Sequence, residues 1–310
     1  MLKIVPLKLN SIAEIENILG FSFDKIKKIV ENKNNFYSKV SIVIKGKMRI
    51  LDIPNSSLKI IQGKLAHYFG ENVVWPYYVQ GGVRNRSVKT NARQHSGKKF
   101  VLNLDIKDFF PSITTKMVKN SLMELGLNQK VSTLISELST YENRVPQGSP
   151  SSTYVANMFF LKIDKLINNF CKKHSLIYTR FVDDLTISGK NNIFPYKGTI
   201  IQYIARNRLI VSEKKTTIRS SSEKQIVTKL VVNDKIRPDK KYILTLKKDI
   251  RETWKGNEGI RKVALKNNIT MPKVKGNLWG RTNYIRQFDK KIGREVRALL
   301  VKSNFVDVSS

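Results

Sequence analysis

Three aspartates stand in apolar surroundings that are unusual for a carboxylate. Asp105 follows the run VLNL, and Asp183 and Asp184 lie together within YTRFVDDLTIS. Adjacent carboxylates in a turn repel each other, and burial increases that cost. A divalent cation such as Mg²⁺ removes it, and a third carboxylate from a neighbouring strand would complete a two-metal clamp for phosphoryl transfer. The simpler alternative is that the pair only caps a turn, where aspartate is common.

The segments around these aspartates predict the strands that must position them. Phe100 to Ile106 predicts a strand that cannot extend past Pro111, and Ile177 to Ser188 predicts a β-hairpin around the acidic turn. The alternation in YSKVSIVIKGKMRILDIP predicts a second hairpin, and 224–236 a third. Helices are predicted over 11–33 with a break near Gly20, and then at 58–69, 115–125, 128–139, 151–170 and 199–208. A strand and turn are predicted at 209–219, a Gly-rich basic loop at 80–90, and mostly helix after 236.

The charge balance of the 310 residues is strongly positive. Lys and Arg number 57 against 24 Asp and Glu, which gives a net charge of +33. Nucleic acid is the commonest polyanion that such a surface binds. The single cysteine, Cys171, excludes an intramolecular disulfide framework and a cysteine-based zinc site. No apolar run suits a signal peptide or a membrane span, so we expect a cytoplasmic protein with no membrane partner.

Several segments occur in the order found in reverse transcriptases. IVIKGKMRILDIP resembles the hairpin that opens the polymerase region, and LDIKDFFPSI resembles the first catalytic motif. VPQGSPSSTYVAN is similar to the Gln-Gly motif, FVDD stands where the family has Tyr-Ala-Asp-Asp, and LIVSEKKT resembles the lysine-bearing motif that follows. The resemblance covers roughly residues 36–290. A turn-capping role for the aspartate pair accounts for none of these additional segments, so the resemblance favours a metal site.

Two further segments resemble the bacterial retron branch of this family. TNARQH, residues 90–95, is similar to an Asn-Ala-x-x-His element, and IVTKLVVN, residues 226–233, is similar to Val-Thr-Gly-Leu-Val-Val-Asn. Lys229 replaces the usual glycine, and Phe181 and Val182 replace Tyr-Ala. Neither departure changes a predicted metal ligand.

The resemblance implies catalytic roles for five residues. Asp105, Asp183 and Asp184, with the backbone carbonyl of Ile106, would hold two Mg²⁺ ions. Lys215 would protonate the leaving pyrophosphate as a general acid. Its neighbour Lys214 could take that place, or Lys215 could be an ordinary surface lysine.

Nucleotide-binding roles follow from the same resemblance. Lys45 and Arg49 would grip the triphosphate from the first hairpin, although both could also lie on an ordinary solvated face. Phe110 would be the steric gate that rejects a ribose 2′-hydroxyl, with a core phenylalanine as the alternative. Gln147 and Gly148 would line the base and sugar, with a plain turn as the alternative.

Nucleic-acid contacts are predicted in two parts of the chain, the C-terminal region and the segment around the Gly-rich loop. Trp279, Tyr284 and Arg286 interleave rings with charge in a basic segment, although the rings could equally be helical core. Further contacts are predicted for three residues near the Gly-rich loop: Arg86, Asn91 and His95. The loop with Arg86 could equally be a solvated turn. His95 is expected either to order the structure or to contact RNA.

The resemblance implies an α+β, right-hand polymerase fold with fingers over 1–100, an antiparallel-sheet palm with a helical insert over 101–236, and a helical, basic thumb over 237–310. It implies RNA-templated DNA synthesis from deoxynucleoside triphosphates, on a noncoding RNA that is both template and primer. It also implies a branched RNA–DNA product and a role in anti-phage defence beside a separate effector protein. The alternatives are an abortive-infection or diversity-generating reverse transcriptase, and a non-catalytic RNA-binding scaffold.

Overall fold

A computed structural model describes residues 9–44 and 47–303 of the chain. The described residues divide into two compact units. The first unit contains residues 9–95 and 99–220, and the second contains 96–98 and 221–303. This is a coarser division than the predicted fingers, palm and thumb, whose boundaries stay a prediction.

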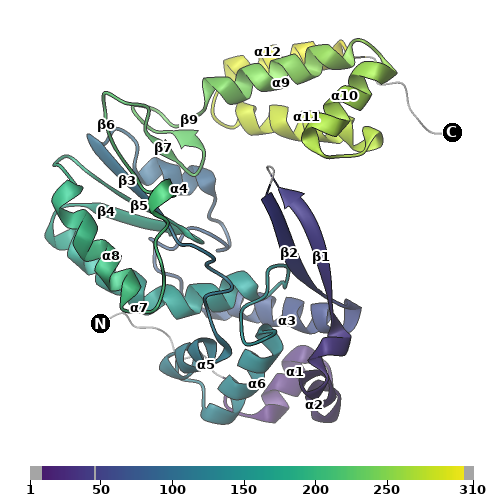
Figure 1. Ribbon diagram of the computed structural model, residues 1–310, viewed down its shortest axis with the longest axis vertical. Helices are drawn as coiled ribbons and strands as arrows, with labels where there is room; N and C mark the ends of the chain where they lie inside the picture. Colours follow the sequence, from purple (N-terminus) through teal and green to yellow (C-terminus); the bar gives the residue numbers. More distant parts are fainter. Residues whose placement is uncertain (1–8, 45–46, 304–310) are drawn as a thin grey trace. The chain divides into compact units, whose positions relative to one another are not determined.

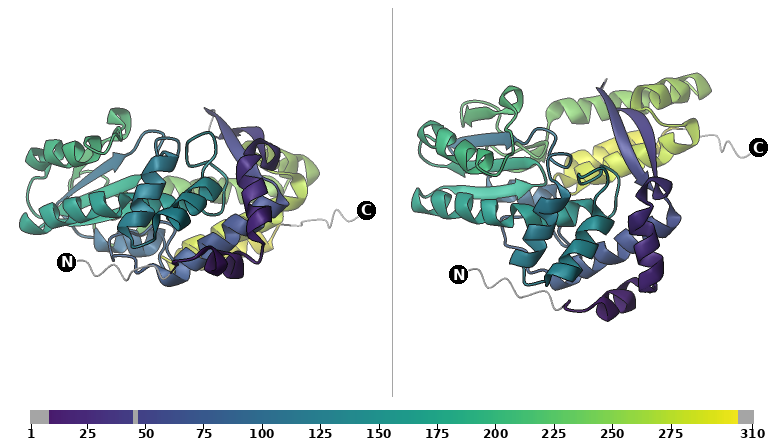
Figure 2. Two further views of the ribbon diagram at one scale, coloured as in Figure 1. Left: turned by 90° about the horizontal axis from the view of Figure 1, so that it is seen from below. Right: turned by 60° about the horizontal axis from the view of Figure 1, so that its bottom comes forward.

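The first unit begins with helices and a long hairpin. Helices α1 (Ile12–Leu19) and α2 (Phe23–Glu31) and the short 3-10 helix η1 (Lys33–Phe36) precede strands β1 (Tyr37–Ile44) and β2 (Lys47–Pro54). Ser11 caps α1 because its side chain accepts from the Glu14 N–H while the Glu14 carboxylate accepts from the Ser11 N–H. The hairpin projects away from the helices of its unit (Figures 1 and 2). The predicted helix break near Gly20 and the predicted hairpin are confirmed.

The rest of this unit contains helices and the four strands of the main sheet, interspersed along the chain. The helices are α3 (Ser56–Asn72), α4 (Val88–Gln94), α5 (Thr115–Glu124), α6 (Gln129–Ser139), α7 (Ser152–Lys173), η2 (Phe194–Tyr196), α8 (Lys197–Ala205) and η3 (Glu213–Lys215). The strands are β3 (Phe100–Asp105), β4 (Ile177–Phe181), β5 (Asp184–Gly189) and β6 (Thr217–Ser220). The helices predicted over 58–69, 115–125, 128–139, 151–170 and 199–208 are confirmed to within a few residues.

The four strands form an antiparallel sheet in the order β4-β5-β3-β6. Most residues of β3, β4 and β5 are buried, whereas all residues of β6 are half-buried, and α7 lies along β4 (Figure 1). The core of this unit contains the buried strand residues Leu102, Leu104, Leu185 and Ile187 together with Phe160, Ile163 and Ile167 of α7. The prediction over 209–219 is only partly right, because Val211 makes an isolated bridge to Ile106 and the strand itself starts at Thr217.

The second unit is a small sheet followed by helices. Strands β7 (Ile226–Val227), β8 (Leu230–Val231) and β9 (Arg237–Pro238) precede α9 (Lys240–Thr253), α10 (Asn257–Asn267), α11 (Met271–Arg286) and α12 (Lys290–Val301). Thr228 and Lys229 form the β7–β8 turn with φ of 44° and 68°. Two left-handed residues in a row are typical of a type I′ hairpin turn, which explains why glycine is usual at position 229. The predicted hairpin and helical C-terminal region are confirmed.

Buried apolar side chains of the four helices give the second unit its own core, including Leu246, Ile250, Val274, Leu278, Ile285 and Val296. Asp249 is buried within it and accepts from Arg281 at 2.8 Å and from Lys266. Among the helices that the structure describes, none combines the length and the apolar composition that a membrane span requires. The α+β class expected from the sequence is confirmed.

Candidate active site

The three predicted carboxylates meet at one end of the main sheet. Asp105 is the last residue of β3, Asp184 is the first residue of β5, and the two lie opposite each other in the antiparallel register. Asp183 occupies the turn between β4 and β5, and its carbonyl accepts from the Ile106 N–H at 3.1 Å. The hairpin and β3 thus bring together residues almost eighty positions apart.

Burial, a hydrogen bond and the charges of three neighbouring side chains affect the pKa of the Asp183 carboxyl. Burial raises the pKa of its carboxyl above the ordinary value, and the Asp105 carboxylate raises it further. A backbone hydrogen bond and the positive charges of Lys215 and Arg49 oppose that rise. Two carboxylates that repel each other away from water form a site with affinity for a cation.

Lys215 is the nearest cation to these carboxylates. Its Nζ donates to Asp105 Oδ1 at 2.7 Å and to Oδ2 at 2.8 Å. The segment that carries it is fixed by the backbone, since the Ser212 N–H donates to the Asp105 carbonyl at 2.7 Å and the Lys107 N–H to the Ile210 carbonyl at 2.8 Å. The Lys215 side chain is 56% exposed, whereas that of Asp105 is 10% exposed. Lys215 can therefore leave Asp105 toward solvent when another cation binds there.

The donor set fits Mg²⁺. Asp105 and Asp183 offer carboxylate oxygens, Ile106 offers a carbonyl oxygen, and Asp184 is exposed beside them. Such hard oxygen ligands suit Mg²⁺, which usually keeps several waters and takes few protein ligands. Within residues 9–44 and 47–303, no group of three or more His, Cys, Asp or Glu side chains is arranged so that it could hold a metal ion. Asp105, Asp183 and the Ile106 carbonyl are the groups that would hold Mg²⁺, together with oxygens of substrate and water.

The first hairpin contributes Arg49 to the same site. Arg49 is exposed on β2 opposite Ile42, and its charge reaches the Asp183 carboxyl. Its guanidinium is therefore accessible, and it is close enough to the carboxylates for its charge to act on Asp183. Lys45, the other predicted phosphate ligand, lies outside the described residues.

Phe110 follows the first carboxylate in the chain and packs beside the core. Its ring centroid is 5.5 Å from that of the buried Phe109, which itself packs on Phe160 at 5.9 Å. Phe110 is only half-buried, so part of its ring remains accessible. The core role falls mainly to Phe109, and the accessible ring of Phe110 is compatible with contact to a sugar.

The Gln-Gly turn is joined to the base of the first hairpin. The carbonyl of Gln147 accepts from the Asp52 N–H at 3.1 Å. Gly148 has φ of 129°, and a Cβ there would lie 3.0 Å from the Asp52 carbonyl oxygen, so a side chain would be strained. Position 148 therefore requires glycine, and the turn and hairpin form one continuous backbone surface.

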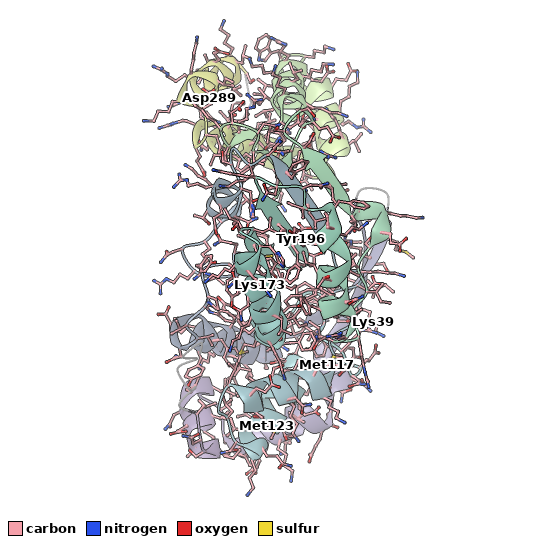
Figure 3. All side chains as sticks on the ribbon, turned by 90° about the vertical axis from the view of Figure 1, so that its left-hand side faces the viewer. Lys39, Met117, Met123, Lys173, Tyr196 and Asp289 are labelled. Atoms are coloured by element: carbon pink, nitrogen blue, oxygen red, sulfur yellow. The ribbon has the colours of Figure 1, made fainter. Side chains whose placement is uncertain are left out.

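Side chains reinforce this junction. The Tyr37 and Tyr141 rings stack with centroids 4.3 Å apart. Lys39, which is labelled in Figure 3, donates to Glu142 at 2.6 Å. Arg144 pairs with Glu142 at 2.9 Å and lies 3.4 Å from the buried Asp52 carboxylate. The orientation of the hairpin that carries Arg49 is thus set by the loop that leads into Gln147.

The three residues near the Gly-rich loop that were predicted to contact nucleic acid make contacts within the protein. Arg86 directs its guanidinium to the backbone carbonyls of Trp75, Pro76 and Val79, and burial lowers its pKa. Asn91 and His95 are fully buried. The His95 ring nitrogens lie 2.7 Å from Ser188 Oγ and from Thr179 Oγ1, so it links α4 to the β4–β5 hairpin. Of the two roles expected for His95, ordering of the structure is the one observed.

The predicted contacts of the second unit lie on α11. Trp279 is half-buried against the helical core with the Arg297 guanidinium 5.7 Å from its ring centroid. Tyr284 packs edge-on against Tyr242 and Phe288, while Arg286 is exposed. Arg286 is therefore accessible to nucleic acid, whereas both rings are partly committed to packing.

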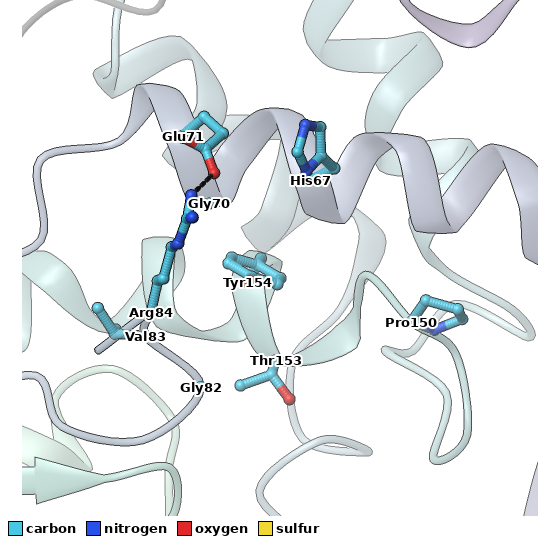
Figure 4. Close-up of a pocket in the computed structure, with 9 residues that line it drawn as sticks. All are labelled: His67, Gly70, Glu71, Gly82, Val83, Arg84, Pro150, Thr153 and Tyr154. Carbon is cyan, nitrogen blue, oxygen red and sulfur yellow. Dashed lines mark hydrogen bonds and ion pairs between the residues drawn. The ribbon is translucent and has the colours of Figure 1, made fainter. Parts of the chain in front are cut away.

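A separate hollow of about 610 Å³ lies between α3, the loop 82–84 and the start of α7 (Figure 4). His67, Tyr154 and Thr153 line it, and Arg84 forms an ion pair with Glu71 at its edge. Its lining contains none of the predicted site residues, so the carboxylates at the end of the main sheet lie outside this hollow.

One buried charge beside the site has no role predicted from the sequence. Arg180 in β4 is fully buried and forms an ion pair with the equally buried Asp164 at 2.7 Å. The signal was an arginine three residues before Asp183 in a strand segment with few other charges, YTRFV. A charged residue at such a position is almost never fully buried without a partner.

Comparison with known proteins agrees with the motifs. Residues 30–245 match the family described as reverse transcriptase (RNA-dependent DNA polymerase). The chain is 29% identical over 230 residues to the retron Ec86 reverse transcriptase of Escherichia coli, covering 73% of this chain and 72% of that protein. It is 33% identical over 233 residues to the retron Se72 reverse transcriptase of Salmonella heidelberg, covering 72% of this chain and 62% of the relative.

A solved structure shows the same fold. A telomerase from Candida albicans, in complex with the TWJ fragment of telomeric RNA, superimposes with a TM-score of 0.50 at 11% identity. The superposition covers 86% of this chain and 60% of that chain. The right-hand polymerase fold expected from the motifs is thereby confirmed.

Proposed function

Because the chain belongs to the reverse transcriptase family, we propose that it is a retron reverse transcriptase that copies a dedicated noncoding RNA into DNA. The observation that supports this most is that Asp105 and Asp183 lie together at one end of the main sheet. The positive charges of Lys215 and Arg49 act on Asp183, and Lys215 also donates to Asp105. The relatives whose sequences it resembles are named as retron enzymes.

Each residue of the site has a part in this proposal. Asp105, Asp183, Asp184 and the Ile106 carbonyl would hold Mg²⁺. When bound, the ions would lower the barrier to attack by a hydroxyl and neutralise charge on the leaving pyrophosphate. Lys215, 2.7 Å from Asp105, would give its proton to the pyrophosphate as the new phosphodiester bond forms.

The remaining residues would bind and select the nucleotide. Arg49 would hold the triphosphate with its planar fork, and Gln147 and Gly148 would lie along the base and sugar. The accessible ring of Phe110 would occupy the space that a ribose 2′-hydroxyl needs. Substrates would thus be deoxynucleoside triphosphates, and the excess of basic residues would bind the RNA backbone.

The proposed RNA is both template and primer. A polymerase that meets only its own transcript can hold that RNA continuously and needs no free primer, because a 2′-hydroxyl of the bound RNA can start synthesis. The product would be a short DNA branched from the RNA (msDNA). We further propose that the complex acts in anti-phage defence with a separate effector protein.

The test is the nucleic acid that copurifies with the protein from cells carrying the whole native locus. The extracted nucleic acid is treated with RNase and resolved on a denaturing gel, before and after debranching. The expected result is a discrete DNA band that shortens after debranching. The matched control is Asp183→Asn expressed from the same locus, which should retain the RNA and lack the DNA.

Other outcomes would assign the chain elsewhere. Heterogeneous RNA without attached DNA would contradict the retron assignment in favour of an abortive-infection or diversity-generating enzyme. Tight RNA binding with no polymerisation on any primed template would favour the non-catalytic scaffold. For the defence role, phage plating on cells with and without the locus should differ, and the Asp183→Asn locus should plate like the empty control.

A further inference from the structure

The turn that carries Asp183 is held in an unfavourable backbone conformation. Val182, directly before Asp183, has φ of 61°. The left-handed region is rare for any residue other than glycine and is a clear outlier for a β-branched one. Such a conformation persists only where the surrounding structure over-determines it. The surroundings of Val182 should therefore contain groups that fix its backbone.

One such group is the guanidinium of Arg180. Its Nη1 donates to the Val182 carbonyl at 3.0 Å and to Asn157 Oδ1 at 2.8 Å. Its Nε and Nη2 donate to the two carboxylate oxygens of Asp164 at 2.9 and 2.7 Å. The bidentate pair with Asp164 fixes the plane of the guanidinium, and that plane aims Nη1 at the carbonyl next to Asp183.

The partners of Arg180 are themselves fixed. Arg180, Asp164 and Asn157 are fully buried, and the Tyr178 hydroxyl donates to Asp164 Oδ1 at 2.5 Å. Asn157 Nδ2 donates to the Gly81 carbonyl at 2.9 Å, and the Phe160 ring centroid lies 4.6 Å from the guanidinium carbon. A buried network with its donors and acceptors satisfied is rigid.

The segment at Gly81 closes the other side of the turn. The N–H groups of Gln80 and Gly81 donate to the Arg180 carbonyl at 2.7 and 3.3 Å. A Cβ at Gly81 would lie 2.4 Å from the Val182 nitrogen and 2.8 Å from the Phe181 carbonyl carbon. Gly81 therefore permits a backbone-to-backbone contact that no other residue allows.

We propose that Arg180 is a positioning residue, which fixes the Val182 carbonyl and thereby the place of the Asp183 carboxylate, with Gly81 as the opposing wall. The inference rests on the proposed function, in which Asp183 is a metal ligand. A buried counter-ion for Asp164 would need only the Nε and Nη2 contacts. The two Nη1 contacts, to Asn157 and to Val182, go beyond what a purely structural pair requires, and the second of them reaches the turn that carries Asp183.

The first test variant is Arg180→Lys in the full chain. Lysine keeps a positive charge beside Asp164, but its single nitrogen cannot reproduce the planar fork that also reaches Val182 and Asn157. Displacement of a reacting group by about 1 Å can cost about 100-fold in rate, so we expect kcat to fall about 10- to 100-fold. The KM for deoxynucleotides and the RNA affinity should change by less than about threefold, since neither depends on Asp183 alone.

The second test variant is Gly81→Ala, matched with Gly63→Ala. Gly81 lies outside the left-handed region, so an alanine there is opposed by the contact with Val182 and not by its own φ. An added Cβ at Gly63, inside α3, meets nothing within 4 Å. Gly81→Ala should lose kcat as Arg180→Lys does, whereas Gly63→Ala should keep it and melt at the same or a higher temperature.

A direct metal readout accompanies the kinetics. Mn²⁺ binding to each purified protein is followed by the electron paramagnetic resonance signal of the free ion. Arg180→Lys and Gly81→Ala should weaken the binding severalfold, and Gly63→Ala should not. Melting temperature and RNA binding report whether each variant is folded.

The outcomes separate this inference from the function on which it rests. Folded Arg180→Lys with kcat and Mn²⁺ affinity within about twofold of the parent would overturn the positioning role. If Arg180→Lys does not fold, Gly81→Ala decides, and unchanged kcat in that variant overturns the proposal. Full polymerisation by Asp183→Asn would instead refute the proposed site, whatever the Arg180 variant does.

Discussion

Substitution of Lys215 by methionine gives the sharpest test of the site chemistry. The change keeps the length of the side chain and removes the ammonium that donates to both oxygens of Asp105. Because the Lys215 side chain is 56% exposed, solvent screens the pair, and its contribution to stability should be no more than about 1 kcal/mol. The melting temperature should therefore fall by only about 2–4 °C.

The expected effect on catalysis is much larger than the effect on stability. Loss of a general acid costs about 10²- to 10⁴-fold in rate, and 100-fold already corresponds to about 2.7 kcal/mol in the barrier. An exposed ion pair cannot account for that amount. Metal affinity should move in the opposite direction, because the ammonium no longer competes for Asp105, and about 1 kcal/mol would tighten Mn²⁺ binding by up to about fivefold.

The assay is single-turnover extension of a primed RNA template at saturating deoxynucleotide, combined with Mn²⁺ binding to the same protein. Lys214→Met is the matched control, since it removes the neighbouring positive charge, and it should keep the rate within about twofold. A rate for Lys215→Met that falls less than about fivefold would refute the general-acid role and leave Lys215 as a counter-ion of Asp105.

Three further predictions concern other parts of the site and the surface. Asp183→Asn and Asp184→Asn should each abolish DNA synthesis while RNA binding survives, because one lost charge weakens the hold on Mg²⁺; persistent synthesis would remove that residue from the metal site. Phe110→Val should admit ribonucleotides in primer extension while much of the deoxynucleotide activity remains, and unchanged discrimination would make Phe110 a core residue. RNA affinity should fall by orders of magnitude between low and moderately high salt if about five to eight phosphates are contacted, whereas a flat salt response would separate the charge of +33 from RNA binding.

The sequence predicts the strands and the carboxylates well because local patterns determine both. A short apolar run places Asp105 at the end of one strand, and two adjacent acids inside an apolar hairpin indicate a cation, since their repulsion would otherwise destabilise the turn. The position of Lys215 beside Asp105 depends on a contact between distant segments of the chain, because the Ser212 N–H that donates to the Asp105 carbonyl fixes the segment with Lys215 against β3. No pattern within the sequence specifies that hydrogen bond.

Residue type alone is an incomplete guide to which polar side chains face nucleic acid. Arg86 and His95 carry side chains suited to RNA, but a basic or aromatic side chain can also satisfy buried backbone and hydroxyl groups. Three carbonyls take the donors of Arg86, and Ser188 and Thr179 take both nitrogens of His95. Arg180 is likewise a basic side chain that bonds to buried groups, in this case from a strand. Residue type cannot distinguish a side chain that binds RNA from one that satisfies buried groups, because packing across the sheet decides which polar groups lose access to water.

The path of the chain after α4 has a consequence for how such proteins diversify. Residues 96–98 belong with 221–303, since the Gly97 N–H donates to the Val232 carbonyl at 3.0 Å and the Ser96 hydroxyl to the Asp234 carbonyl at 2.7 Å. The chain therefore passes between the two units three times, at 95/96, 98/99 and 220/221, and not through a single linker. A recombination that exchanged only the codons after 220 would bring in a new C-terminal unit while leaving the old 96–98 segment inside it. Inheritance of this region as a module thus requires the short insert and the distant segment to change together.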